Sequence, residues 1–317
     1  MDESLKNNPS KFLLALATFG LFLVWGNSFI AIGFLLGNDG AQPRFDWIGL
    51  MIARFLLAAL VAVSYLFIFK AKDAWVLFKK HKIRLAIVAT LNVPAYNLAL
   101  NYAQQNGVPA HIASLTTTLA PLFIMFLAAF FLDEKLTFRR ILGFSIAALG
   151  MLLIAASKGG FSDYSLMVAI TILAPLAWSI YSVISKPVLE KESAVLWTYL
   201  GLTISGLYIL PFAPTYAWPS ITRLDTHGWM ALLYLSLPCT VVGFAIWSWL
   251  LRHLPASSVG FTVFLNPPLT SLSKFTLAVL FPATFMFSIS GWEWVGAAIT
   301  LLGLSVAIYQ GSKKNVG

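Results

Sequence analysis

Residues 108–131 read VPAHIASLTTTLAPLFIMFLAAFF, and residues 254–281 read LPASSVGFTVFLNPPLTSLSKFTLAVLF. The Pro-Ala pair that begins at Pro109 recurs 146 positions later at Pro255, and Pro121 recurs at the same distance as Pro267. Both stretches are apolar over more than the roughly 20 residues that a helix needs to cross the hydrocarbon core of a bilayer. The two halves of the chain are therefore predicted to contain related membrane-spanning helices.

Further matches extend this repeat at a slightly longer distance. Trp25 matches Trp178 at 153 positions, and Arg140-Ile141-Leu142-Gly143 matches Glu293-Trp294-Val295-Gly296 at the same 153 positions. Gly150 then falls on Gly303. The change from 146 to 153 indicates a seven-residue insertion between the ninth and tenth apolar segments. Chance does not easily produce four matches in register, so we interpret the chain as an internal duplication.

The composition of the 317 residues excludes most soluble classes of protein, because 59% are apolar and only 10% are charged. Soluble domains average about 25% charged residues, and disordered chains combine low hydrophobicity with high charge. Ten spans would leave too few residues for a soluble domain. A polytopic membrane protein, located as a multi-pass protein in the cell (inner or plasma) membrane, is the class that remains.

Ten apolar segments can be marked along the chain. They cover residues 12–35, 46–69, 84–104, 109–132, 139–157, 165–186, 195–213, 227–251, 255–281 and 292–311. Their continuous apolar runs lack the alternation of transmembrane β-strands, and helices are the other structure that satisfies every backbone group in lipid. We expect an all-α membrane protein with ten transmembrane helices.

The distribution of Lys and Arg predicts the orientation of these helices, because both accumulate in cytoplasmic loops. Of the 21 such residues, 16 fall on the side of the N-terminus, 3 fall on the other side, and Arg54 and Lys274 lie within spans. Both tails, residues 1–11 and 312–317, are thus predicted to be cytoplasmic. The net charge of +9 reflects this topology, and we expect no nucleic-acid partner.

The repeats are predicted to occupy residues 12–157 and 158–311. Each contains five spans, and an odd number of spans inverts the second repeat relative to the first. Inverted repeats are typical of transporters that work by alternating access, with a site near the midplane where the repeats meet.

Short motifs occur along the chain in a specific order and spacing. They are Trp25-Gly26-Asn27-Ser28, Ala53-Arg54-Phe55, Ala113-Ser114-Leu115 with Pro121, Asp133-Glu134-Lys135-Leu136, Trp178-Ser179-Ile180-Tyr181, Ser257-Ser258-Val259 and Asn266-Pro267. With these motifs, residues 12–311 resemble the drug/metabolite transporter superfamily in its EamA-like branch. The resemblance implies two inverted five-helix repeats around a central cavity, and transport of small metabolites, often amino-acid export as in the YddG-like exporters. One departure is Phe281-Pro282-Ala283-Thr284, where a Gly-Glu or Asp-Glu would follow span nine.

Polar side chains inside the spans form two stripes that are candidates for substrate binding. Polar groups at lipid depth are expensive, and they tend to face a cavity or a partner helix. Hydrogen bonding between helices is the alternative role for these side chains. The candidates are Tyr96, Asn97 and Asn101 in span three, Thr117 in span four, and Thr262, Asn266, Thr270 and Lys274 in span nine.

Aromatic residues and prolines in mid-span give further candidates. Trp25, Trp178, Tyr181 and Trp247 either wall a cavity or pack in the protein interior. Pro121 and Pro267 are predicted to kink spans four and nine and to act as hinges, the alternative being packed bends without a role. Gly143, Ala147 and Gly150, mirrored by Gly296, Thr300 and Gly303, are predicted to form helix-packing faces.

Arg54 and Lys274 are candidates for binding a substrate carboxylate or phosphate. For Lys274 the alternatives are reaching to the headgroups and capping carbonyls near Pro267-Pro268. No acidic residue lies deep in a span, and no nucleotide loop, metal-ligand cluster or Ser-His pair is visible. We therefore expect no enzyme activity, no cofactor and no metal.

These features predict a transporter that exports or equilibrates small metabolites, above all amino acids. A carrier of anionic metabolites, phosphorylated or carboxylated, is the alternative. The expected partners are a small-molecule substrate and the lipid bilayer, and the chain is a monomer or a homodimer. An intramembrane enzyme would need a nucleophile, base or metal at depth, which the spans do not supply.

Overall fold

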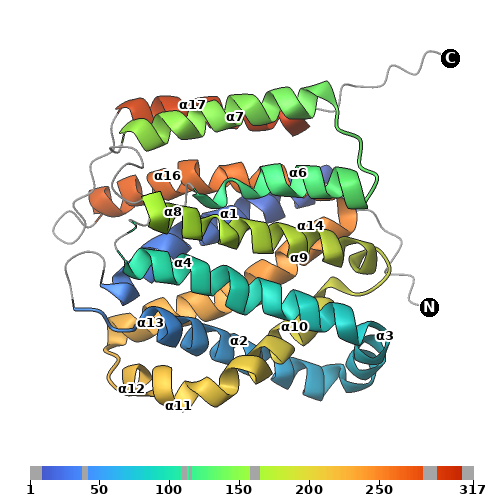
Figure 1. The fold of residues 1–317 in the computed structure, drawn as a ribbon, viewed down its shortest axis with the longest axis vertical. Helices are drawn as coiled ribbons and strands as arrows, with labels where there is room; N and C mark the ends of the chain where they lie inside the picture. Colours follow the sequence, from blue (N-terminus) through green and yellow to red (C-terminus); the bar gives the residue numbers. More distant parts are fainter. Residues whose placement is uncertain are drawn as a thin grey trace.

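The computed structural model describes residues 9–37, 42–106, 108, 113, 116–157, 165–280 and 291–308. Every regular element within these residues is helical. Figure 1 shows the longer helices lying side by side, roughly along one common direction. The prediction of an all-α protein is confirmed for the part of the chain that the structure describes.

The described part of the first half contains seven helical elements. They are α1 (Lys11–Leu36), α2 (Trp47–Phe69), α3 (Ala71–Thr90), the π-helical turn η2 (Leu91–Ala95), α4 (Tyr96–Gln105), α6 (Ala120–Phe131) and α7 (Phe138–Ser157).

The second half contains more and shorter elements. They are α8 (Ser165–Thr171), α9 (Leu173–Leu189), α10 (Ala194–Ile209), the 3-10 turn η4 (Leu210–Phe212), α11 (Ala213–Tyr216), α12 (Trp218–Ile221), α13 (Thr226–Tyr234), the π-helical segment η5 (Leu235–Val242), α14 (Gly243–His253), α15 (Ala256–Phe261), the 3-10 turn η6 (Thr262–Leu265), α16 (Asn266–Leu280) and α17 (Gly291–Ile308).

Six helical runs among the described residues are long and apolar enough to cross a membrane: Lys11–Leu36, Trp47–Phe69, Ala71–Gln105, Ala169–Leu189, Ala194–Tyr216 and Thr226–His253. Ala120–Phe131 and Trp294–Ala307 are shorter apolar helices. The third run begins 13 residues before residue 84, where the sequence predicted its start. Lysines favour helix, and Ala74 and Leu77 are buried among them, so the basic stretch is helical.

Side-chain caps explain where several helices begin. Ser10 Oγ accepts a hydrogen bond from the Leu13 amide at 3.1 Å, and Asp46 Oδ1 accepts one from the Gly49 amide at 2.7 Å. Asp225 Oδ1 accepts one from the Gly228 amide at 2.9 Å. The first amides of a helix lack partners inside the helix, so each cap fixes the first turn.

Asp225 also ties α13 to the segment before α2. Arg44 Nε and Nη2 donate to its two carboxylate oxygens at 2.9 and 3.0 Å. Hydrogen bonds from Arg44, and next the bond from the Gly228 amide, hold the pKa of the Asp225 carboxyl well below its usual range. This pair joins the matched halves at the end of the bundle where α2 and α13 begin.

Two π-helical segments form a further part of the internal repeat. The sequence Leu91-Asn92-Val93-Pro94-Ala95 in η2 corresponds to Leu235-Ser236-Leu237-Pro238-Cys239 in η5, 144 positions later. A proline lacks the N–H that would bond four residues back, so the helix is locally disturbed at each of these positions. This pair of prolines was missed in the sequence prediction, although its spacing is close to that of the other matches.

Pro121 and Pro267 each stand at the start of a helical segment. The chain turns at Thr118 and Leu119, so Pro121 lies in the first turn of α6. Pro267 is the second residue of α16 and follows η6. A first turn tolerates proline because its N–H has no partner within the helix. The expected mid-span bends are thus interruptions between two segments, and hinge motion at them stays a prediction.

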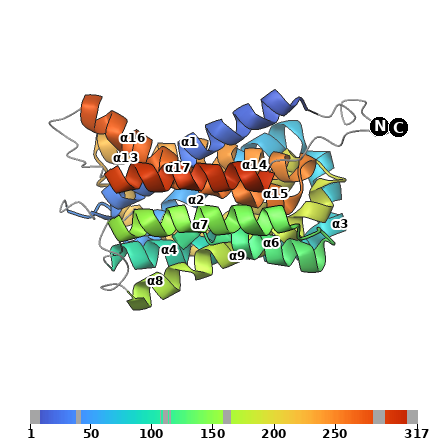
Figure 2. The ribbon, with the colours of Figure 1, turned by 90° about the horizontal axis from the view of Figure 1, so that it is seen from above.

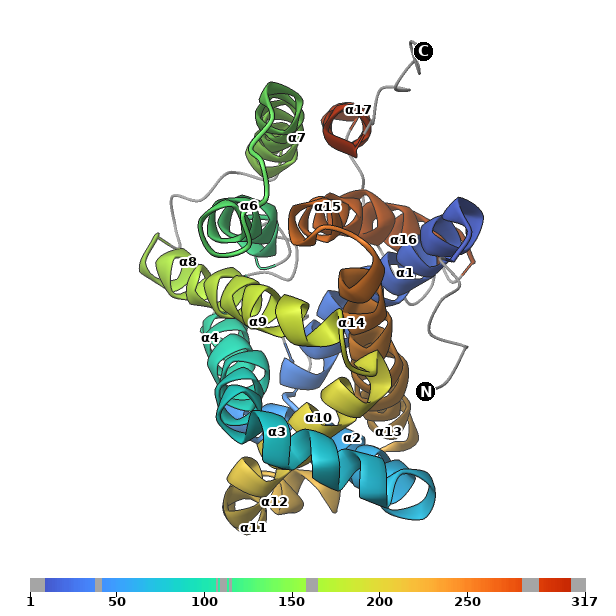
Figure 3. The same cartoon turned by 90° about the vertical axis from the view of Figure 1, so that its right-hand side faces the viewer.

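Helices α7 and α17 pack against each other through small residues. A Cβ added at Gly143 would lie 2.5 Å from the Ala307 amide nitrogen, and one at Gly150 would lie 2.5 Å from Thr300 Oγ1. A Cβ added at Gly303 would meet the Ala147 backbone. The predicted packing faces are confirmed, and Figure 3 shows this pair beside α6, α15 and α16.

The start of α1 and the end of α17 lie on the same side of the molecule. In Figures 1 and 2, α1 begins and α17 ends on the side of the molecule where α3 lies. We call this side the basic end, because it carries Lys80 and Arg84 of α3, Arg140 at the start of α7, and Arg252 at the end of α14. The outermost tail residues, 1–8 and 309–317, lie outside the described residues.

Candidate functional site

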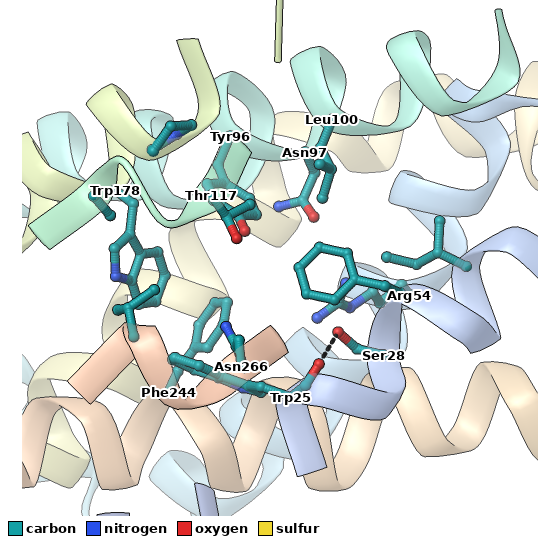
Figure 4. A pocket seen from close by; sticks show the side chains of 15 residues that line it. Trp25, Ser28, Arg54, Tyr96, Asn97, Leu100, Thr117, Trp178, Phe244 and Asn266 are labelled. Carbon is teal, nitrogen blue, oxygen red and sulfur yellow. Dashed lines mark hydrogen bonds between the residues drawn. The ribbon is translucent and has the colours of Figure 1, made fainter. Parts of the chain in front are cut away.

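A pocket lies between the two halves of the chain. Its cavity volume is about 50 Å³. Its walls come from α1, α2, α4, α6, α9, α14, η6, α16 and the turn before α6; they are Trp25, Ser28, Phe29, Ile32, Arg54, Tyr96, Asn97, Leu100, Thr117, Ala120, Pro175, Trp178, Phe244, Val263 and Asn266. Figure 4 shows Asn97 and Thr117 on one side of this space, with Ser28, Trp25 and Asn266 on the other.

Seven of the thirteen residues predicted to bind substrate line this pocket, and they come from both matched halves. They are Trp25, Arg54, Tyr96, Asn97, Thr117, Trp178 and Asn266. Apart from the neighbours Tyr96 and Asn97 they lie far apart in the sequence, so the fold brings them together.

Thr262, Thr270 and Asn101 are buried but do not line the pocket. Thr270 Oγ1 lies 2.9 Å from the Gly26 carbonyl oxygen, and Thr262 Oγ1 donates to the Val259 carbonyl oxygen at 2.5 Å. Asn101 Nδ2 donates to the Trp47 carbonyl oxygen at 3.2 Å, which links α4 to α2. These groups bond to the protein backbone in this conformation.

Tyr181 and Trp247 lie next to the pocket rather than on its wall. Their ring centroids are 5.1 and 5.2 Å from that of Trp178. Tyr181 Oη and Ser248 Oγ are 3.2 Å apart, and Trp247 Nε1 donates to Ser182 Oγ at 3.2 Å. These two candidates therefore pack against the ring of Trp178 without lining the pocket themselves. Lys274 belongs to α16, but its side chain lies outside the described part of the structure.

Some pocket residues were missed by the sequence prediction, above all Phe244 and Ser28. Phe244 precedes Trp247 by three positions and Ser28 follows Trp25 by three, so each shares a helix face with a predicted residue. That spacing is the signal that could have identified them. Phe29, Ile32, Leu100 and Val263 look like ordinary membrane residues in the sequence, and nothing distinguishes them there.

Three aromatic side chains of the pocket, Trp25, Trp178 and Phe244, pack against one another and form what we call the aromatic wall. The Trp25 ring centroid is 5.4 Å from that of Trp178 and 5.7 Å from that of Trp247. The rings of Trp178 and Phe244 are 5.3 Å apart. Trp247 and Tyr181 continue this packing toward the basic end along α14 and α9, and both are almost fully buried. An apolar group in the pocket would rest on these rings.

Arg54 is the cation of the pocket. Its side chain is 7% exposed, and its Nε donates to Thr240 Oγ1 at 2.8 Å. No ion pair joins it to a carboxylate among the described residues. A buried charge is costly unless it is paired, and a guanidinium matches a carboxylate or phosphate geometrically. The pocket is therefore suited to an anionic group.

Asn97 and Asn266 supply oxygen atoms that can accept hydrogen bonds. Asn97 Nδ2 donates to the Val93 carbonyl oxygen at 3.0 Å, which leaves its Oδ1 for another partner. Asn266 Oδ1 is buried and has no hydrogen-bond partner. A buried oxygen without a partner, as Asn266 Oδ1 is, favours a donor such as an ammonium group or a water molecule. The pocket thus combines a cation, amide acceptors and an aromatic wall.

A bundle of apolar helices around a pocket with buried polar groups is the architecture of a membrane transporter. The model of the EamA-like transporter family matches the chain twice, at residues 12–156 and 165–309. The chain belongs to this family. Its apolar helices and this membership make it a multi-pass membrane protein.

Several curated proteins resemble the chain along much of its length. A probable amino-acid metabolite efflux pump of Salmonella typhimurium is 26% identical over 310 residues, covering 90% of this chain and 92% of that protein. Its namesake in Escherichia coli is 25% identical over 305 residues, with the same coverage of 90% and 92%. A probable terminal-alkyne amino-acid exporter of Streptantibioticus cattleyicolor is 27% identical over 191 residues, covering 60% of this chain and 63% of that protein.

The fold also resembles a solved structure. One crystal structure superposes with a TM-score of 0.66 at 21% sequence identity, covering 94% of this chain and 97% of the other. At this identity the similarity concerns the fold alone.

Proposed function

We propose that the chain exports or equilibrates small metabolites, above all amino acids, through the pocket described here. The pocket carries this proposal, because Arg54 suits a carboxylate, while Asn97 and Asn266 suit an ammonium group. The names of the relatives, two amino-acid metabolite efflux pumps and an amino-acid exporter, point the same way. The aromatic wall offers a surface for an apolar side chain.

We further propose ten membrane crossings arranged as two inverted repeats, residues 12–157 and 158–311, with both tails in the cytoplasm. The double match to the family model supports two repeats. The start of α1 and the end of α17 lie on the same side of the molecule, which supports an even number of membrane crossings. Alternating access would then expose the pocket to each side in turn, with Pro121 and Pro267 as hinges.

A reporter that is active only in the cytoplasm tests this topology. Fused after Gly317, it is expected to be active, because the basic end should face the cytoplasm. Inserted within residues 158–164, it is expected to be silent. The opposite pattern would reject both the orientation and the inverted repeat.

A carrier of anionic metabolites is the second candidate function. The observation in its favour is the unpaired charge of Arg54, since no carboxylate pairs with it among the described residues. A phosphorylated or dicarboxylic substrate would use that cation without needing Asn97 and Asn266 as ammonium acceptors. Lys274 is a further cation that we assign to such a substrate, on the basis of the sequence alone.

Transport by the purified protein in liposomes distinguishes these functions. We expect uptake of labelled amino acids that carry a free carboxylate. Uptake of the corresponding amides by the unmodified protein, and uptake of the acids by Arg54→Gln, are expected to be about 10- to 100-fold lower. The reason is that a hydrogen bond to a charged group contributes roughly 1.5–3 kcal/mol. Lys80→Gln is the matched control, because Lys80 is an exposed cation far from the pocket. Uptake of sugar phosphates but not amino acids would favour the second candidate. Equal uptake of acid and amide by the unmodified protein would contradict both.

A further inference from the structure

The π-helical segment η5 contacts Arg54, a residue of the pocket wall, through Thr240, which does not itself line the pocket. Thr240 is fully buried, and its Oγ1 donates to the Leu235 carbonyl oxygen at 2.8 Å. Thr240 Oγ1 also lies 2.8 Å from Arg54 Nε. A hydroxyl group has a single proton, and Thr240 uses it on Leu235. The direction of the second bond is therefore fixed: Arg54 donates and Thr240 accepts.

Thr240 lies in an irregular part of its helical run. Pro238 cannot donate a backbone hydrogen bond, and the helix runs in π-helical form around it. The next residue toward the C-terminus, Cys239, accepts a hydrogen bond from Trp25 Nε1 at its carbonyl oxygen, at 2.8 Å. Two adjacent residues of η5 thus hold the cation and one aromatic ring of the pocket.

The bond to Thr240 also determines which edge of the guanidinium remains for a ligand. A carboxylate can bind a guanidinium through two parallel hydrogen bonds, either along the edge that includes Nε or at the end formed by the two Nη atoms. Thr240 occupies the Nε position. The end with the two Nη atoms is left, and Figure 4 shows the guanidinium turned toward the cavity near Ser28.

We propose that Thr240 is a positioning residue for substrate recognition: it holds the Arg54 guanidinium so that its two Nη atoms bind the carboxylate of the substrate end-on. Selectivity for a free carboxylate then depends on Thr240 as well as on Arg54. This inference rests on the function proposed above, in which Arg54 binds that carboxylate.

The variant Thr240→Val tests this role, because valine keeps the shape of threonine and removes only the hydroxyl. The measured quantity is the ratio of acid to amide uptake for one amino acid in the same liposomes, so the amount of folded protein cancels. We expect this ratio to fall about tenfold in Thr240→Val, with a higher half-saturating concentration for the acid and an unchanged one for the amide. Thr240→Ser, which keeps the hydroxyl, is expected to restore most of the ratio.

Ser236→Ala is the matched control within η5. Ser236 is fully buried, and its hydroxyl bonds to the Leu232 carbonyl oxygen of its own helical run at 2.7 Å. Its loss removes a buried hydroxyl without touching Arg54, so the ratio is expected to stay at the unmodified value. A purely structural role of Thr240 would change the uptake of acid and amide equally.

The outcomes separate this inference from the proposed function. If the unmodified protein transports acid and amide equally, the proposed function fails. If the unmodified protein prefers the acid, Arg54→Gln abolishes that preference and Thr240→Val retains it, then Arg54 binds the carboxylate without help from Thr240 and the positioning role is rejected. Should the valine variant yield no folded protein, the ratio in Thr240→Ala decides in the same way.

Discussion

Gly150→Ala is expected to destabilise the protein strongly by forcing α7 and α17 apart. The added Cβ would lie 2.5 Å from Thr300 Oγ1 and 2.6 Å from the Gly296 carbonyl oxygen. Backbone atoms cannot rotate away as a flexible side chain can, so the helices must separate and lose packing along their length. Overpacking of this kind costs about 1–3 kcal/mol or more. The measurement is the midpoint of thermal unfolding in detergent.

Gly201→Ala is the control for this substitution. Gly201 lies inside α10, and a Cβ added there meets nothing within 4 Å. Alanine favours helix over glycine by roughly 1 kcal/mol at either position, so the difference between the two variants isolates packing. Equal midpoints for both variants would show that α7 and α17 do not pack through Gly150.

Glu134→Ala is expected to have the second large effect on stability. Glu134 Oε1 accepts a hydrogen bond from the Ala256 amide at 2.6 Å, and Oε2 accepts one from the Ser257 amide at 3.2 Å and another from the Ser257 hydroxyl. Arg140 Nη1 lies 3.7 Å from Oε2. Alanine leaves these donors without their acceptor, at about 1–3 kcal/mol for each buried group left unsatisfied. Thermal unfolding again measures the loss.

Asp73→Ala provides the comparison at the same end of the molecule. Asp73 pairs with Lys70 at 3.4 Å, and both side chains are about half exposed. Exposed pairs contribute roughly 0–1 kcal/mol, so this variant is expected to unfold close to the unmodified protein. If Glu134→Ala unfolds at the same temperature as Asp73→Ala, the carboxylate does not hold the start of α15.

The fold was predictable where the sequence contains long apolar runs and residues that repeat between the two halves. The length of the apolar runs predicted the helices, and the small residues around Gly143 and Gly303 predicted packing faces. That these two faces pack against each other is known only from the structure. The π-helical segments could not be predicted from apolar periodicity, because a run such as Leu235–Val242 is apolar whichever way its backbone hydrogen bonds are arranged.

The pocket was predictable only in part, because a polar stripe does not reveal what it faces. Asn266 and Thr270 are four residues apart on one face of α16, yet Asn266 lines the pocket and Thr270 contacts α1. Thr270 contacts α1 because Gly26 lets the two helices approach closely. A Cβ added at Gly26 would lie 3.0 Å from Thr270 Oγ1. Such a contact depends on two distant segments and is invisible in either one.

The hydrogen bonds between Glu134 and the start of α15 have a further consequence, because the second repeat contains no residue equivalent to Glu134. The chain contains no Asp or Glu from residue 226 to residue 292, so the sequence that follows span nine has no carboxylate at the position equivalent to Glu134. For the alternating-access cycle proposed above, a perfectly symmetric duplication would make the two access states equal in free energy. The hydrogen bonds of Glu134, which have no carboxylate counterpart in the second repeat, remove that degeneracy. Each net hydrogen bond contributes about 1 kcal/mol, so a few of them weight one state over the other by roughly 10- to 100-fold.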